Sequence, residues 1–167
     1  MDLYLVRHAI AEERSPDNPL PDAERALTLE GIKKMRRNVR ALRRLAVDID
    51  AVWTSPLKRA AQTADILAAE LGISSRLSPL DALTPAGSFD AVVEELRLHA
   101  DFRGVALVGH QPYLGEFASY LLTGSRAADV DFKKGGVACI AINDFTDPVR
   151  GRLQWLLTPR QMARLKD

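Results

Sequence analysis

Polar side chains that could perform chemistry stand at the ends of three apolar stretches. They are Arg7-His8 after LYLV, Thr54-Ser55 ahead of Lys58-Arg59, and Gly109-His110 after VALV. Arginine and histidine are costly to bury without a partner. The planar arginine fork suits phosphate oxygens, and a neutral imidazole is a competent nucleophile at pH 7. If the three groups meet, they form a pocket for a phosphoryl group.

The elements that would bring these groups together follow from the hydrophobic pattern. Strands are predicted at 2–7, 49–55, 76–80 (weakly) and 104–110, with an antiparallel pair in GVACIAIND and RLQWLLTP at the end. Helices are predicted from Thr28 to about Leu45, from Ser55-Pro56 to Gly72, at 88–100 and 113–122, with a short one at the C-terminus. A long loop, 9–27, follows the first strand.

This alternation predicts a three-layer α/β/α sandwich whose mostly parallel sheet carries an antiparallel edge. Because ligands bind beyond the carboxyl ends of parallel strands, the three polar groups would share one edge of the sheet. The helix that starts near Pro56 would add amide donors and the positive end of its dipole.

Length and composition limit the possible functions. A chain of 167 residues predicts a single domain, 1–167. The formal net charge of +1 argues against a nucleic-acid partner. Only Cys139 is present, which fits a reducing compartment. No apolar run approaches the ~20 residues that cross a bilayer, so we expect a cytoplasmic protein with no membrane partner.

Three motifs resemble those of the histidine phosphatase superfamily, which has the phosphoglycerate mutase-like fold. LVRHA at 5–9 is similar to its Arg-His-Gly signature, TSPLKRAAQTA at 54–64 to its second element, and VGHQP at 108–112 to its third. With ALTLEG at 26–31 and the small size, the chain resembles the SixA-type phosphohistidine phosphatases in particular.

The resemblance implies a covalent mechanism. His8 would take the phosphoryl group and pass it to water, while Arg7, Arg59 and His110 hold the oxygens and Ser55 helps to bind substrate. The residues themselves support the role of His8, because flanking arginines disfavour its protonation and a backbone carbonyl can fix its tautomer.

Two departures from the family pattern matter. Ala9 replaces the signature glycine, which is tolerable unless the backbone there needs a positive φ. In addition, no carboxylic acid is clearly suited to protonate a leaving group; Asp81 and Glu12, or its neighbour Glu13, are the candidates.

The leaving group decides how much a weak acid matters. An alkoxide, whose conjugate acid has a pKa of ~16, departs with difficulty without a proton donor. An imidazole, with a conjugate acid near ~6.5, departs easily. We therefore expect the substrate to be phosphohistidine on a signalling or phosphotransfer protein, such as a histidine-containing phosphotransfer domain. The alternatives are a small-molecule phosphomonoesterase and a non-catalytic phosphoprotein-binding module.

Other ligands and surfaces can be anticipated as well. We expect no cofactor and no metal, because arginines repel a cation and no third ligand stands at a recognisable spacing. Phosphate or sulfate should be able to occupy the pocket. The basic run at 33–44 is either the solvated face of an amphipathic helix or a dock for an acidic or phosphorylated partner.

Overall fold

One mixed sheet forms the centre of the protein in the computed structural model, which describes residues 1–13, 19 and 21–165. Within these residues the strands follow the order β3-β2-β4-β1-β5-β6. They are β1 (Asp2–Arg7), β2 (Ala51–Thr54), β3 (Leu77–Pro79), β4 (Gly104–Gly109), β5 (Val137–Ile142) and β6 (Gly151–Leu157). The first four strands are mutually parallel, and β5 and β6 form the antiparallel edge. The predicted sheet is confirmed.

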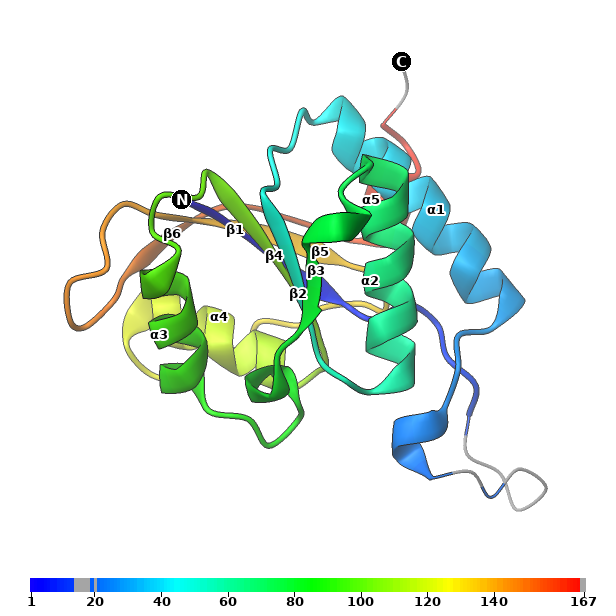
Figure 1. Ribbon diagram of the computed structural model, residues 1–167, viewed down its shortest axis with the longest axis horizontal. Helices are drawn as coiled ribbons and strands as arrows, with labels where there is room; N and C mark the ends of the chain where they lie inside the picture. The colour runs from blue at the N-terminus through cyan, green and yellow to red at the C-terminus, as the bar shows by residue number, and fades with distance from the viewer. Residues whose placement is uncertain (14–18, 20, 166–167) are drawn as a thin grey trace.

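Helices cover both faces of this sheet (Figure 1). They are α1 (Leu29–Arg44), α2 (Lys58–Leu71), α3 (Phe89–Leu98), α4 (Tyr113–Thr123) and α5 (Pro159–Met162). Because successive side chains of a strand point to opposite faces, Leu3 and Leu5 of β1 pack in the core with α3 and α4, whereas Tyr4 and Val6 pack in the core with α1 and α2. The three-layer sandwich is therefore confirmed, with one core on each side of the sheet.

Local sequence signals explain where the helices that frame the site begin and end. The Thr28 hydroxyl caps α1 by accepting from the amide of Gly31 at 3.0 Å, as predicted. Gly72 ends α2 with a left-handed φ of 76°, also as predicted. The prediction that Ser55 caps α2 is wrong, because the helix begins only at Lys58, with Leu57 at the N-cap. The Ser55 hydroxyl bonds to His110 and accepts from the amide of Leu57, ahead of the helix, at 3.4 Å.

The predicted loop at 9–27 contains local structure. Ala11 pairs with Leu27 as an isolated antiparallel bridge, and a 3₁₀ turn spans Asp22–Glu24. Residues 14–18 and 20 of this loop lie outside the described residues. In the part of the chain that is described, each helix is too short or too polar to span a bilayer.

Candidate active site

The carboxyl ends of the central parallel strands bring the predicted polar groups together. Arg7 lies opposite Gly109 in the pairing of β1 with β4, and the His8 amide continues the ladder by donating to the Gly109 carbonyl at 2.9 Å. On the other side of β4, the Ser55 amide donates to the carbonyl of Val108 at 2.9 Å. The sheet register therefore fixes the backbone of all three motifs relative to one another.

The two histidine rings face each other across this edge. Their centroids lie 5.2 Å apart, at an interplanar angle of 54°. His8 Nδ1 donates to the carbonyl oxygen of Ala9 at 2.7 Å, so its proton is held there and the lone pair lies on Nε2. His110 Nε2 bonds to the Ser55 hydroxyl at 2.8 Å. His110 Nδ1 is buried and has no hydrogen-bond partner among the described residues.

Burial keeps both rings neutral. Desolvation lowers the pKa of His8 to about 4; the bond to Ala9 opposes this shift, and the charges of Arg59 and Arg7 add to it. Desolvation likewise lowers the pKa of His110 to about 3, again with Arg59 contributing. At pH 7 each imidazole therefore carries one proton and offers one unprotonated nitrogen.

Arg59 reaches the site from the first turn of α2 and is only 4% exposed. Its Nη1 donates to the backbone carbonyl of Asp22 at 2.7 Å, and its Nη2 to the Asp22 carboxylate at 3.0 Å. The same carboxylate accepts from Arg25 Nε at 2.9 Å. Asp22 was not anticipated, because it lies in the long loop and no spacing in the sequence marks it as a partner of Arg59.

Arg7 and Ala9 are held on either side of His8. The Nη1 group of Arg7 donates to the backbone carbonyl of Phe132, and burial lowers the pKa of this guanidinium. The Ala9 amide donates to Thr63 Oγ1 at 3.1 Å, and that hydroxyl donates to the carbonyl of Arg59 at 2.7 Å. Ala9 does not adopt a positive φ, so alanine fits this backbone without strain.

A glycine ahead of β5 supports the histidine from a third direction. The Gly135 amide donates to the carbonyls of Arg7 and His8, at 3.2 and 3.1 Å, and its own carbonyl accepts from the buried Asn38 amide at 3.1 Å. Gly135 has a φ of 80°, a conformation that favours glycine. Neither Gly135 nor Asn38 was anticipated, since only the three-dimensional path of the chain brings them to His8.

The carboxylic acids predicted as proton donors are not bonded to the candidate site among the described residues. Asp81 is exposed at the start of the 3₁₀ turn Asp81–Leu83, and Glu12 and Glu13 follow the bridge residue Ala11. Among the described residues, the carboxylates of these three make no hydrogen bond or ion pair with the site. A proton-donor role for any of them stays a prediction. No cluster of three or more potential metal ligands occurs in the described part of the chain.

Comparison with known sequences places this geometry in a family. The model of the histidine phosphatase superfamily (branch 1) matches residues 3–83. An uncharacterized protein of Picosynechococcus is 37% identical over 142 residues, which are 82% of each chain. The chain belongs to the histidine phosphatase superfamily. Membership supports a phosphatase, and the predicted resemblance is confirmed.

Two further comparisons concern the SixA type within this superfamily. The phosphohistidine phosphatase SixA of Escherichia coli K12 is 24% identical over 168 residues, 99% of each chain. A solved structure of the protein histidine phosphatase SixA complexed with tungstate superposes with a TM-score of 0.84, at 25% identity, over 96% of this chain and 98% of that one. This superfamily member therefore has the SixA-type fold over nearly its whole length.

Proposed function

We propose that this phosphatase hydrolyses phosphohistidine on a signalling or phosphotransfer protein, with His8 as the nucleophile. The observation that carries the proposal is the state of the His8 ring: its Nδ1 proton is bound to the Ala9 carbonyl, and burial keeps Nε2 unprotonated. An unprotonated nitrogen beside two arginines can attack a phosphoryl group whose charge those arginines balance.

The reaction would proceed in two displacements. The substrate ring first takes a proton from water on its free nitrogen. The His8 Nε2 lone pair then forms a bond to phosphorus while the bond from phosphorus to the substrate ring breaks, and the ring leaves as a neutral imidazole. Water then attacks the phosphorus on His8, and the bond from phosphorus to Nε2 breaks. One proton of this water stays on the released phosphate, and the other passes to solvent. The proton stays on His8 Nδ1, which donates it to the Ala9 carbonyl throughout.

The surrounding residues would position the phosphoryl oxygens. Arg7 and Arg59 supply guanidinium donors, and His110 Nδ1, which has no partner among the described residues, can donate to a phosphoryl oxygen when Nε2 accepts from the Ser55 hydroxyl. Ser55 would hold the His110 ring through its bond to Nε2. Positioning and electrostatic stabilisation are then the main sources of catalysis. No metal or cofactor enters this scheme.

The leaving group supports phosphohistidine over a phosphoester. In the described part of the chain, Asp81 and Glu12, the predicted proton donors, make no bond to the site, and an imidazole can leave without a strong acid whereas an alkoxide cannot. The names of the SixA relatives point to the same substrate class, and the tungstate bound to one of them is consistent with a site for phosphate or sulfate.

A substrate comparison tests the proposal. The protein is mixed rapidly with a phosphorylated histidine-containing phosphotransfer domain, and separately with serine phosphate, and phosphate release is followed. We expect faster release from the phosphohistidine, through an acid-labile, alkali-stable phosphoenzyme. His8→Gln should lower the rate at least about a thousandfold and abolish the phosphoenzyme. His99→Gln, which alters a histidine outside the site, is the matched control.

The other outcomes correspond to the remaining hypotheses. Faster release from serine phosphate, with a rate that falls as a carboxylic acid ionises, would identify a phosphomonoesterase, and Asp81 and Glu12 would then be tested as donors. Tight binding of the phosphorylated domain without any release would identify a non-catalytic phosphoprotein-binding module.

A further inference from the structure

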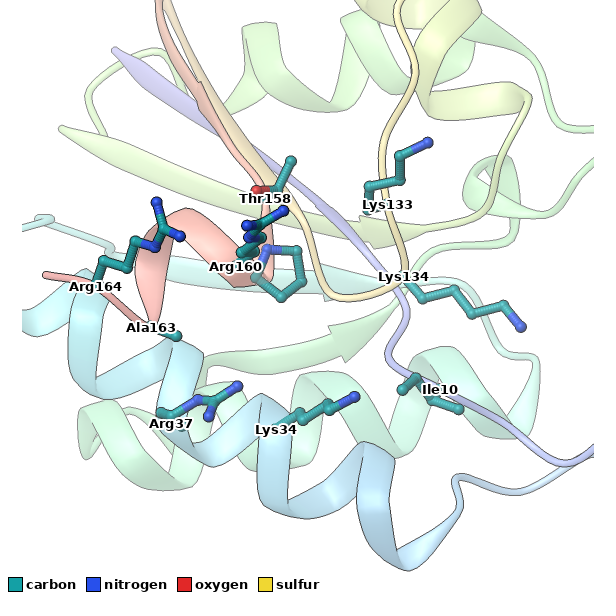
Figure 2. Close-up of a pocket in the computed structure, with 10 residues that line it drawn as sticks. Ile10, Lys34, Arg37, Lys133, Lys134, Thr158, Arg160, Ala163 and Arg164 are labelled. Atoms are coloured by element: carbon teal, nitrogen blue, oxygen red, sulfur yellow. The ribbon is translucent and has the colours of Figure 1, made fainter.

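A basic groove with a volume of about 640 Å³ lies beside the candidate site, between α1, α5 and the segment ahead of β5 (Figure 2). The cations that line it are Lys34, Arg37, Lys133, Lys134, Arg160 and Arg164. They come from distant parts of the sequence: two from α1, two from the segment ahead of β5, and two from α5 and the residues just after it. Among the residues that the structure describes, none that lines the groove is acidic.

Most of this positive charge is not neutralised. Lys34 pairs with Glu30 and Lys133 with Asp131, each at 2.5 Å. The other four cations form no ion pair with any residue that the structure describes. Cations gathered without acids repel one another and produce a local positive potential, although the chain as a whole has a formal charge of only +1. An anionic partner would relieve this repulsion.

The floor of the groove indicates which kind of anion fits. Ile10, Pro159 and Ala163 supply apolar side chains to its lining beside the cations. An inorganic polyanion would gain nothing from such a surface. A polypeptide that carries both carboxylates and apolar side chains would bury the latter on the floor and pair the former with the rim. The volume lies within the range of pockets that hold whole ligands.

The groove also adjoins the residues around His8. Ile10 lies two residues after His8 along the chain, and Lys134 directly precedes Gly135, whose amide holds the His8 carbonyl. A polypeptide in the groove would therefore lie next to the histidine that accepts the phosphoryl group.

We propose that this basic groove binds an acidic segment of the phosphoprotein, near its phosphorylated histidine. This proposal rests on the proposed function. It also separates the basic residues of the run at 33–44 into those that would contact the partner and those that would not. Lys34 and Arg37 would contact the partner, whereas Arg36 pairs loosely with Glu70 at 3.9 Å and Arg44 donates to the carbonyl of Leu165.

Two synthetic peptides test the groove directly. Both carry a central phosphohistidine; in one the flanks contain glutamate and leucine, and in the other each glutamate is replaced by glutamine. For the unaltered protein we expect kcat/KM to be at least about tenfold higher with the acidic peptide. The double variant Arg37→Glu, Arg160→Glu should lose this preference, since each change reverses an exposed charge on the rim.

Controls separate docking from chemistry and from net charge. Arg43→Glu with Arg152→Glu changes the net charge equally at exposed positions outside the groove, and should keep the preference. Hydrolysis of free phosphohistidine should stay within about twofold in every variant. Added sodium chloride should reduce the preference, because it screens exposed charges.

Distinct results would overturn the two proposals. If the unaltered protein hydrolyses neither peptide nor free phosphohistidine, the proposed function is wrong. If it is hydrolysed but both peptides react equally, or the control variant loses the preference as fully as the groove variant, the groove proposal alone is wrong. Inhibition by tripolyphosphate that is abolished in the groove variant, without any peptide preference, would replace it with a site for a small polyanion.

Discussion

The His8 imidazole keeps one nitrogen unprotonated and the other protonated, an assignment that is not fixed for a free imidazole in water. It is buried among cations, which disfavours a proton on Nε2, yet its Nδ1 proton is retained by the Ala9 carbonyl. A free imidazole exchanges between tautomers, whereas this bond selects one. The residue can therefore present the same nitrogen over the whole neutral pH range.

The lowered pKa values predict how stability depends on pH. Between pH 6.5 and about 4, the unfolded chain protonates His8 while the folded chain does not, and for His110 this window reaches about 3. Stability should therefore fall as pH falls, by up to about 1.4 kcal/mol per pH unit for each ring. Urea unfolding at pH 6.5 and 5 measures the slope. A variant with both residues changed to glutamine should show a flatter slope; an unchanged slope would contradict the prediction.

The Ser55 hydroxyl should matter for both stability and rate. Ser55→Ala leaves the buried His110 Nε2 without its partner, which costs roughly 1–3 kcal/mol of unfolding free energy. Because the ring is then free to turn, we expect kcat to fall about tenfold, with a smaller change in KM. Steady-state kinetics and thermal unfolding measure the two effects. Ser78→Ala, at an exposed position on β3, is a matched control that should change neither.

At this scale the sequence was informative wherever a motif joins residue type to strand position. Arg7, His8 and His110 follow strands that the hydrophobic pattern marks clearly. Asp22 and Gly135 could not be predicted, because their contacts depend on where a loop returns in space. No periodicity encodes such a return.

The elements are positioned by close backbone approaches as well as by their apolar faces. The first turn of α1 lies against the strand exit just after His8 and Ala9, where a Cβ on Gly31 would stand 2.1 Å from the carbonyl oxygen of Ile10. This contact explains why the ALTLEG segment ends in glycine. It also joins α1, which lines the basic groove, to the backbone of the candidate site.

Replacing this glycine should reveal the contact. Helix propensity alone would make Gly31→Ala stabilising by roughly 0.5–1 kcal/mol. The clash with a backbone atom should reverse the sign and destabilise the protein by about 1–3 kcal/mol. Urea unfolding measures the difference. A stabilised variant would show that α1 and the Ile10 segment can separate without cost.

The ends of helices could be predicted where a capping residue determines them, and not where tertiary contacts determine them. Thr28 and Gly72 act through their own local chemistry, so the sequence locates both helix ends. Ser55-Pro56 has the pattern of a helix start, but the serine hydroxyl is bonded to His110 across the sheet. The serine therefore serves a long-range partner that the local signal does not reveal, and α2 begins at Lys58.

In the whole molecule, the position of the candidate site depends on the central sheet and on the helices that cover it. Helices on both faces bury all of β4 and the four inner residues of β1, so the polar groups at the strand ends are held by two cores at once. This architecture was predictable from the alternation of strands and helices. The strand order was not, because the pattern does not state which strands are neighbours.

An anion in the site should stabilise the entire fold. At a phosphate concentration one hundred times its dissociation constant, the free energy of unfolding should rise by about 2.7 kcal/mol, which corresponds to roughly 5–10 °C in Tm. Differential scanning calorimetry measures the shift, and dialysis against phosphate-free buffer should reverse it. Chloride at equal ionic strength is the control; an equal shift with chloride would argue against a phosphate site.

The pairing of Asp22 with Arg59 places an anionic side chain of the protein itself on the guanidinium that is expected to bind phosphate. Both terminal nitrogens of the guanidinium already hold oxygens of Asp22. A phosphoryl group that binds to both nitrogens must displace Asp22. Because Asp22 belongs to the same chain, it rebinds at high effective concentration when the product dissociates. Under the proposed function, binding at Arg59 would thus exchange one anion for another, which would weaken retention of free phosphate and favour repeated turnover.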